Sequence, residues 1–355
     1  MHATASSSLE AVLPYEATRP IQFQTFLAAE VPPQRVAQLI KLLAQKSPLP
    51  NHLKRVKNKN TAKYVLLLRI DDKRVEQIDQ VNGDEYEGQR QMQKIVSQSF
   101  TADVVNLVHD CLYILERVPK HAPVTRAQFE EWTVYWPIVY HDGAAKQALT
   151  LWASLPCDEE LVRLRSYMRR VIDITIQARV VGGDAGKRRV GALLVRPASE
   201  GRAEQVIAEH VDAAGCFGYS PNDQHPGHPL HHSLMLCISS VASLLRQQGR
   251  YDGDGDCNGS LNCTISKKRS AETRPNCDYL CKDCDAFVLF EPCAMCAMAL
   301  VHSRIRRLFY AIESPGGALG SRYRVHTVRS LNHHYQVVRG LLRDEAIEQH
   351  LYHDV

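Results

Sequence analysis

The sequence has no apolar run long enough to cross a membrane as a helix. Its longest uncharged apolar stretch, residues 233 to 245, is shorter than the roughly 18 to 20 residues that a membrane helix needs, and serines interrupt it. The first ten residues lack a basic segment followed by an apolar one, so we do not expect a secretory signal there. We therefore predict a protein with no membrane partner.

The chain also lacks a strong excess of either charge and a regular cysteine framework. The net charge of +4 permits nucleic-acid binding but does not by itself argue for it. Eleven cysteines are an odd number without a small secreted scaffold, which favours a reducing compartment with thiols that are free or bound to metal. The length of 355 residues and 45% hydrophobic content predict two globular domains.

Residues 1–137 are predicted to form a small α+β domain. Apolar spacing from Val36 to Leu43 predicts a helix, and 64–70 and 112–118 are predicted strands, with a further strand near 21–28 and a helix near 100–109. Thr125 and Gln128 form a capping-box pattern, so a helix is expected to begin there.

Residues 138–157 are predicted to be a linker and 158–355 a second domain. Its elements are expected in the order helix, strand, strand, helix, strand, helix, strand. The helix at 232–245 is apolar almost all round and is expected to be covered on both sides. Residues 250–277 are rich in Gly, Asn, Asp and Ser, which predicts a flexible insertion.

The segment Pro292-Cys293-Ala294-Met295-Cys296 is the most informative motif in the chain. Two cysteines three positions apart share one face of a helix, and Pro292 suits the first helical position. The partial positive charge of a helix N-terminus favours thiolates, and two thiolates at this spacing suit zinc. A pair of buried core cysteines is the alternative interpretation.

A zinc site of this kind needs a nitrogen ligand, and histidines cluster upstream at 225, 228, 231 and 232. His232 opens the apolar helix and is the ligand that we favour. Zinc nucleobase deaminases combine His-x-Glu with Pro-Cys-x-x-Cys, and the glutamate moves the proton of the metal-bound water. Leu234 occupies the position of that general acid and base, so no catalytic residue is assigned. Glu291 is expected to lie at the end of the preceding strand, so we do not expect it to replace the missing glutamate.

The segments "HPLHHSLMLC", "CDAFVLFEPCAMCAMALVHSRIRRLFYAI" and "LNHHYQVVRG" resemble the tRNA adenosine deaminases. The closer resemblance is to the non-catalytic subunit of the eukaryotic heterodimer that converts wobble adenosine-34 to inosine, which lacks the same glutamate. This resemblance implies a cytidine-deaminase-like three-layer αβα domain and a Zn²⁺ bound by His232, Cys293 and Cys296. It also implies a catalytic deaminase subunit as partner, the tRNA anticodon arm as ligand, and an N-terminal domain that helps to bind tRNA.

Two features do not match the family pattern. The insertion at 250–277 has no counterpart, and Cys281 and Cys284 form a second Cys-x-x-Cys. These two thiols are either incidental or bind a second metal together with Cys257, Cys263 and Cys277. In the tail, His350, His353 and Asp354 are candidates to cap the metal in place of water.

Clusters of basic residues indicate where RNA contacts are expected, because Lys and Arg neutralise phosphates. One cluster comprises Lys54, Arg55, Lys57 and Lys59, with Lys63 beyond it. The other comprises Arg322, Tyr323 and Arg324, where the tyrosine could stack a base, with Arg329 nearby. Arg163, Arg165, Arg169 and Arg170, on one helix, either pair with acids or face RNA. A solvated surface is the alternative for all of them.

These observations predict a zinc-binding, catalytically silent subunit of a tRNA adenosine-34 deaminase that positions tRNA and stabilises the complex. One alternative is an active deaminase whose proton shuttle lies elsewhere, for example at Glu209 or Asp354. A second alternative is a zinc-stabilised module for RNA binding or assembly. The expected location is the nucleus and cytoplasm.

Overall fold

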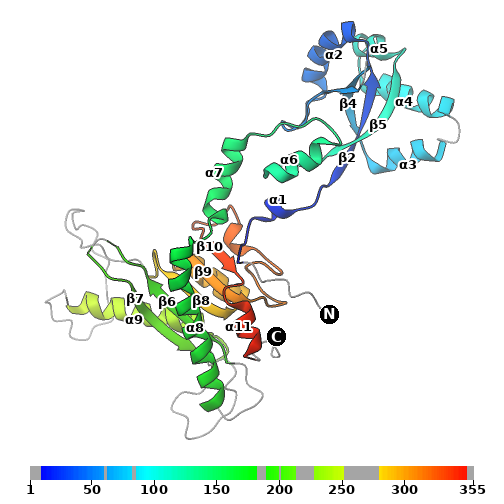
Figure 1. The fold of residues 1–355 in the computed structure, drawn as a ribbon. Coiled ribbons are helices and arrows are strands. Elements are labelled where there is room, and N and C mark those ends of the chain that lie inside the picture. Colours follow the sequence, from blue (N-terminus) through cyan, green and yellow to red (C-terminus); the bar gives the residue numbers. More distant parts are fainter. Residues whose placement is uncertain are drawn as a thin grey trace, which may run out of the picture. The chain divides into compact units, whose positions relative to one another are not determined.

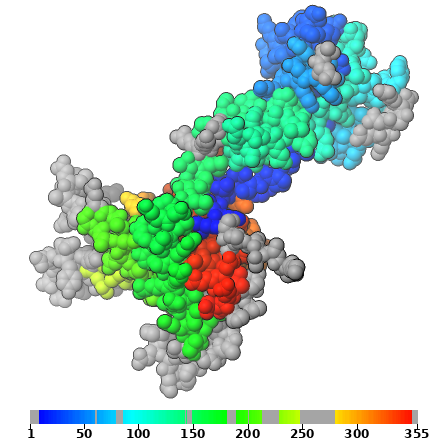
Figure 2. Space-filling view, viewed as in Figure 1, coloured from blue at the N-terminus to red at the C-terminus, as the bar shows by residue number. Residues whose placement is uncertain are grey.

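The computed structural model describes residues 9–59, 62–81, 85–181, 189–199, 201–212, 228–251 and 280–349. The chain divides into two compact units (Figure 1). Unit 1 comprises Met1–Pro14 and Thr150–Val355, and unit 2 comprises Tyr15–Leu149. The described residues of both units are coloured in Figure 2. Among these residues, no helix is long and apolar enough to cross a membrane.

Unit 2 is built on a four-stranded antiparallel sheet in the order β3-β4-β2-β5. Alternation along the strands gives the sheet two apolar faces. One face packs on a core with Leu27 and Leu39, and the other packs on Trp132 and Trp136, both almost fully buried. The elements are α1 (Tyr15–Thr18), β2 (Phe23–Glu30), α2 (Pro33–Lys46), β3 (Val56–Lys59), β4 (Ala62–Ile70), α3 (Asp72–Val81), α4 (Glu85–Ser99), α5 (Ala102–Val108), β5 (Leu112–Pro119) and α6 (Arg126–Thr133).

The predicted start of α6 is confirmed in detail. The Thr125 side chain accepts a hydrogen bond from the backbone N–H of Gln128, and the Gln128 side chain accepts one from the backbone N–H of Thr125. Helices α3 and α4 were not predicted. Both are dominated by Gln and charged residues, so that Ile78, Met92 and Val96 are the buried apolar side chains that hold them to the core.

Unit 1 contains a six-stranded sheet in the order β1-β10-β9-β8-β6-β7, and strands β8, β9 and β10 run parallel. Tyr167 of α8 packs against Phe287 on one face of β8, whereas Val288 and Phe290 line a pocket on the other face. This is the predicted αβα arrangement. The elements are β1 (Glu10–Ala11), α8 (Asp158–Val181), β6 (Gly191–Arg196), β7 (Gln205–Val211), α9 (Ser233–Tyr251), β8 (Asp285–Phe290), α10 (Ala294–His302), β9 (Arg307–Ile312), η1 (Val325–Thr327), β10 (Gln336–Arg339) and α11 (Arg343–Glu348).

The structure differs from the predictions in three places, two of which concern the domain boundaries. Strand β1 pairs with β10, so Glu10 and Ala11 lie in unit 1 and not in an N-terminal domain. The predicted linker contains a helix, α7 (Asp142–Ala153). Helix α9 is buried mainly through Leu234, Cys237 and Val241, and Leu244 is 46% exposed, so the helix is not covered on both sides. Of the predicted insertion, residues 252–277 lie outside the described residues.

A charged cluster fixes the start of the two strands that carry the site. The buried carboxylate of Asp285 accepts hydrogen bonds from Arg306 and Arg307, and Arg307 also donates to Glu160 of α8 at 2.6 Å. Arg307 and Asp285 are both nearly removed from water, so each charge depends on the other for compensation. This cluster connects the first residues of β8 and β9 to α8, at the end of the strands opposite to the site.

Candidate metal centre

Strand β8 leads directly into the two cysteines. The chain leaves the sheet at Glu291 and Pro292, and Cys293 becomes the N-cap of α10 with φ −70° and ψ 171°. Pro292 therefore precedes the N-cap and lies two positions before the first helical residue, Ala294, whereas the sequence predicted Pro292 at the first helical position. Cys293 and Cys296 both lie in the first turn, where the unpaired backbone N–H groups favour negative charge.

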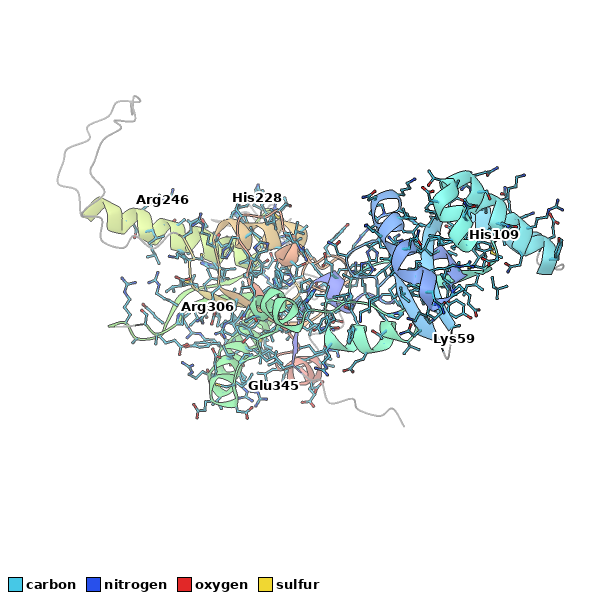
Figure 3. All side chains as sticks on the ribbon, turned by 90° about the horizontal axis from the view of Figure 1, so that it is seen from above. Lys59, His109, His228, Arg246, Arg306 and Glu345 are labelled. Carbon is cyan, nitrogen blue, oxygen red and sulfur yellow. The ribbon has the colours of Figure 1, made fainter. Side chains whose placement is uncertain are left out.

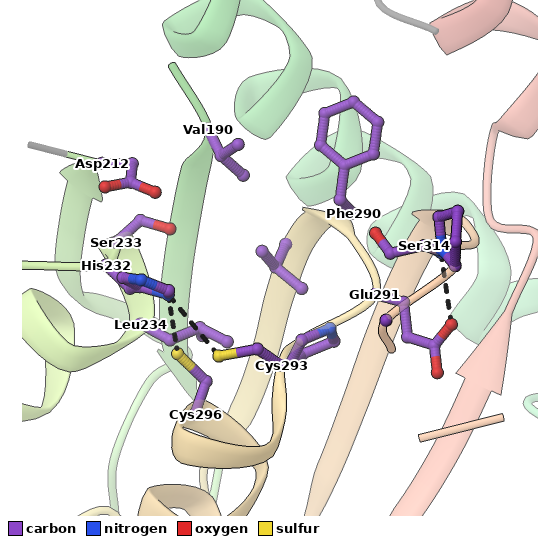
Figure 4. A pocket seen from close by; sticks show the side chains of 14 residues that line it. Val190, Asp212, His232, Ser233, Leu234, Phe290, Glu291, Cys293, Cys296 and Ser314 are labelled. Atoms are coloured by element: carbon purple, nitrogen blue, oxygen red, sulfur yellow. Dashed lines mark hydrogen bonds between the residues drawn. The ribbon is translucent and has the colours of Figure 1, made fainter. Parts of the chain in front are cut away.

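His232 is the histidine that meets these cysteines, as predicted. Its Nδ1 lies 3.6 Å from Sγ of Cys293 and 3.5 Å from Sγ of Cys296 (Figure 4). The three ligand atoms all lie within 4.8 Å of one another. The rings of His228 and His231 instead contact each other and are largely exposed.

These distances fit a tetrahedral metal site. With zinc bonds of about 2.3 Å to sulfur and about 2.0 Å to nitrogen, tetrahedral angles place the nitrogen and sulfur atoms about 3.5 Å apart. Two thiolates and one imidazole are a usual donor set for this ion and leave one position for a fourth ligand. Among the described residues, His232, Cys293 and Cys296 are the one group of this kind.

The two thiols are electrostatically unequal. The thiol of Cys296 donates a hydrogen bond to Cys293, which lowers the pKa of Cys293 to about 5 against the opposing effect of burial. The same hydrogen bond and burial raise the pKa of Cys296. One thiolate is therefore present at neutral pH, and a cation bound between the two sulfurs would favour deprotonation of the second.

A pocket of about 240 Å³ opens beside these three residues. Its apolar wall consists of Val190, Leu234, Val288 and Phe290, and Leu234 is only 2% exposed. Figure 4 shows the Leu234 side chain beside the histidine and the two cysteines. An uncharged side chain therefore occupies the place where the sequence motif of a deaminase has its proton shuttle.

Glu291 lines the same pocket, but its carboxylate accepts hydrogen bonds from a loop. It accepts hydrogen bonds from the backbone N–H groups of Ser314, Leu319 and Ser321 and from the Ser321 hydroxyl. A Cβ atom at Gly317 would overlap this carboxylate, so glycine is required there for steric reasons. The carboxylate holds the loop at 314–321, whose first residues, Ser314 to Gly316, line the rim of the pocket.

Three other carboxylates bear on the alternative of an active enzyme. Glu209, proposed from the sequence as a shuttle, forms an ion pair with Arg170 at 2.6 Å and does not line the pocket. Asp354 lies outside the described residues. Asp212 lines the pocket and was missed, because its place at the end of β7 becomes informative only when the sheet brings it beside His232.

The residues of the first basic cluster differ in their contacts and in their exposure. The guanidinium of Arg55 donates hydrogen bonds to the carbonyl oxygens of Leu66 and Ser47, so its predicted phosphate contact would compete with these bonds. Lys57 donates to the carbonyl oxygen of Tyr135 at 2.8 Å. Lys54 and Lys59 are exposed, and Lys59 is labelled in Figure 3.

The second cluster directly follows the 314–321 loop in the chain. The backbone N–H groups of Arg322 and Tyr323 donate to the carbonyl oxygen of Gly317, and both side chains are exposed with the guanidinium over the tyrosine ring. Arg324 is half-buried and donates to the carbonyl oxygen of Leu13 at 3.0 Å. Arg322 and Tyr323 are therefore the accessible members.

Three of the four arginines on α8 pair with acids. The ion pairs join Arg163 to Glu204, Arg169 to Glu345 and Arg170 to Glu209. The alternative of pairing with acids therefore accounts for these three side chains, whereas Arg165 forms no ion pair with an acid of the described residues.

Cys281 and Cys284 are both buried in the core of unit 1. Burial raises the pKa of Cys281 to about 12. They belong to no group of three metal-ligand side chains among the described residues. Cys257, Cys263 and Cys277 lie outside the described residues, as do His350, His353 and Asp354.

Comparison with known proteins agrees with this geometry. Residues 163–312 match the family of the cytidine and deoxycytidylate deaminase zinc-binding region. Unit 1 therefore contains a cytidine deaminase-like domain, as the sequence predicted.

The relatives of the chain indicate which deaminase-like proteins it resembles. A mouse protein named probable inactive tRNA-specific adenosine deaminase-like protein 3 is 35% identical over 240 residues, which cover 64% of this chain and 62% of the mouse protein. The Arabidopsis thaliana tRNA-specific adenosine deaminase TAD3 is 28% identical over 70% of this chain and 76% of its own length. The chain is thus homologous to these deaminase-like proteins, and the predicted resemblance is confirmed.

One solved structure is from a study of A-to-I editing by tRNA:A34 deaminases. It is 23% identical over 52% of this chain and 98% of its own, with a TM-score of 0.32. The match to the mouse protein spans about three fifths of that relative's length.

Proposed function

We propose that this chain is the zinc-binding, catalytically silent subunit of a heterodimeric tRNA adenosine deaminase that makes inosine at wobble position 34. Leu234 is the observation that carries this proposal. It lies in the pocket wall two residues after His232 and is almost fully buried.

The chemistry explains why this residue is decisive. Zinc bound by His232, Cys293 and Cys296 would polarise a water molecule, and deamination then requires a group that takes the water proton and delivers it to the base. Leucine cannot bind a proton. General acid–base catalysis contributes roughly 10² to 10⁴ in rate, so its loss leaves the metal with a mainly structural role.

Other carboxylates do not readily replace the missing group. Glu291 is held by four donors of the 314–321 loop, and Glu209 is paired with Arg170. Asp212 is the carboxylate that supports a second candidate function, an active deaminase, because it lines the pocket.

The names of the relatives support the assignment to a complex. The matching Schizosaccharomyces pombe protein is named a tRNA-specific adenosine deaminase subunit. A silent subunit requires a catalytic partner for the reaction. The exposed Arg322 and Tyr323, which follow the 314–321 loop, would then contact RNA that enters the complex.

The test measures adenosine-to-inosine conversion at position 34 in single turnover. The samples are the zinc-loaded chain alone, its Asp212→Asn variant, and the chain mixed with a candidate catalytic subunit. We expect conversion in the mixture and none by the chain alone. Conversion by the chain alone that is lost in Asp212→Asn would establish the active-enzyme alternative instead.

A further inference from the structure

Two aromatic rings on unit 2 form a contact that the sheet holds in place at the surface. Tyr135 follows α6 and is 44% exposed, and its ring meets Phe23 edge to face with centroids 4.8 Å apart. The neighbouring Val134 is 77% exposed. The flanking Trp132 and Trp136 are almost fully buried, so Tyr135 is presented on a rigid base.

A cation extends this aromatic pair along the sheet. The guanidinium carbon of Arg117 lies 4.4 Å from the centre of the Phe23 ring, and the Arg117 side chain is exposed. A guanidinium that stacks on a ring keeps its N–H groups available for phosphate. No ion pair of Arg117 is recorded among the described residues.

Two lysines are connected to Tyr135 and its neighbour Trp136. Lys57 donates to the Tyr135 carbonyl oxygen at 2.8 Å and lies over the Trp136 ring at 5.3 Å. The backbone carbonyl of Lys54 accepts a hydrogen bond from the Trp136 indole at 2.6 Å, and the Lys54 side chain is exposed. We call Lys54, Lys57, Tyr135, Phe23 and Arg117 the basic–aromatic strip.

Acidic side chains only partly offset the positive charge of the strip. Glu116 lies 3.8 Å from Lys57 and neutralises it in part, and Glu131 is exposed on α6 one turn before Tyr135. Lys54 and Arg117 keep their charge for a ligand. Aromatic rings between exposed cations are complementary to unpaired nucleic acid, in which phosphates and base faces are both accessible.

We propose that the basic–aromatic strip binds an unpaired segment of RNA, with one base stacked on Tyr135 and adjacent phosphates bound by Arg117 and Lys54. This inference rests on the proposed function for its RNA substrate, and it adds Tyr135, Phe23 and Arg117 to the two lysines that charge clustering had already identified. Duplex RNA would gain the phosphate contacts but not the stacking, because its bases are already stacked on each other.

The test uses the full zinc-loaded chain and two labelled probes: an oligouridylate of about 12 nucleotides and an RNA duplex of similar length. Fluorescence anisotropy gives the Kd of each probe at several salt concentrations. Tyr135→Ala should weaken oligouridylate binding about tenfold, while Tyr135→Phe, which keeps the ring, should restore it. Arg117→Gln should lower the salt slope by about one for both probes.

Tyr86→Ala is the matched control, since Tyr86 is a 77% exposed tyrosine on α4 of the same unit and lies outside the strip. Circular dichroism checks that each variant is folded. The inference is overturned if Tyr135→Ala and Arg117→Gln bind oligouridylate as well as the wild-type chain does, or if Tyr86→Ala loses as much affinity as Tyr135→Ala.

Failure of the strip and failure of the proposed function give different results. If the wild-type chain mixed with a catalytic subunit makes inosine but the strip variants bind RNA normally, only the strip is wrong. If the mixture makes no inosine while Tyr135→Ala still weakens oligouridylate binding, the strip is correct and the deaminase assignment is wrong.

Discussion

Gly317 and Glu291 give the sharpest prediction about how the pocket rim is built. A methyl group at position 317 would overlap the Glu291 carboxylate, whereas a methyl group at Gly316 would meet no atom within 4 Å. The backbone N–H groups of Leu319 and Ser321 donate to the same carboxylate at 2.8 and 3.0 Å. Gly317→Ala must therefore displace the acceptor that holds the rim.

The size of the effect follows from the groups that move. Overpacking in a tight site costs about 1–3 kcal/mol, and each lost hydrogen bond to a charged acceptor costs about 1.5–3 kcal/mol. Because the rim can relax toward water, we expect Gly317→Ala to lower the free energy of unfolding of unit 1 by about 3 kcal/mol. For a unit of this size the Tm should fall by roughly 6–12 °C.

The assay is a double-mutant cycle with Gly317→Ala, Glu291→Ala and the pair, followed by thermal and urea unfolding. Since both changes disrupt one contact, the pair should cost less than the sum by about 1–2 kcal/mol. Gly316→Ala serves as control and should change stability by less than about 0.5 kcal/mol. Equal losses from Gly316→Ala and Gly317→Ala, or strict additivity in the cycle, would refute the reasoning.

Three further predictions concern stability. Burial lowers the pKa of His326 to about 4 from 6.5, so the unfolded state binds protons first and stability falls from pH 6.5 toward 4. At pH 5.5 this loss is about 1.4 kcal/mol, and urea unfolding should show it for the wild-type chain but not for His326→Gln. Asp285→Asn should cost about 1.5–3 kcal/mol, because Arg307 loses its charge-assisted hydrogen bonds to Asp285 but keeps its ion pair with Glu160, whereas a loss no greater than that of an exposed ion pair would contradict this. Arg55→Gln should lower the Tm of unit 2 and Lys59→Gln should not, since only Arg55 donates to buried backbone; equal values would count against that difference.

The sequence predicted well those parts that depend on local pattern. The Pro-Cys-x-x-Cys motif and the histidine that precedes the apolar helix predicted that His232, Cys293 and Cys296 form one site. The fold brings these three side chains together, although more than sixty residues separate the histidine from the cysteines. The order of strands and helices from α8 to β9 was predicted because each has a clear apolar period or a buried apolar run.

The remainder depends on contacts that no local pattern contains. Strand β1 has two residues, and its partner β10 lies at the other end of the chain, so no window of sequence predicts the pair. Asp212 lines the pocket because the sheet positions the end of β7 there. Tyr135 is exposed, whereas the nearby Trp132 and Trp136 are buried, and no local pattern distinguishes the three aromatic residues. Charge clustering likewise gave no sign that Arg55 donates hydrogen bonds to the carbonyl oxygens of Leu66 and Ser47.

The central claim is that this chain contributes to wobble deamination without performing the chemistry. The most direct measurement is single-turnover inosine formation at tRNA position 34 by the zinc-loaded chain, by a candidate catalytic subunit, and by both together. The account predicts that the chain alone forms no inosine and that the mixture converts faster than the candidate subunit does alone. Conversion by the chain alone at an enzyme-like rate would contradict it, because Leu234 would then not have silenced the pocket.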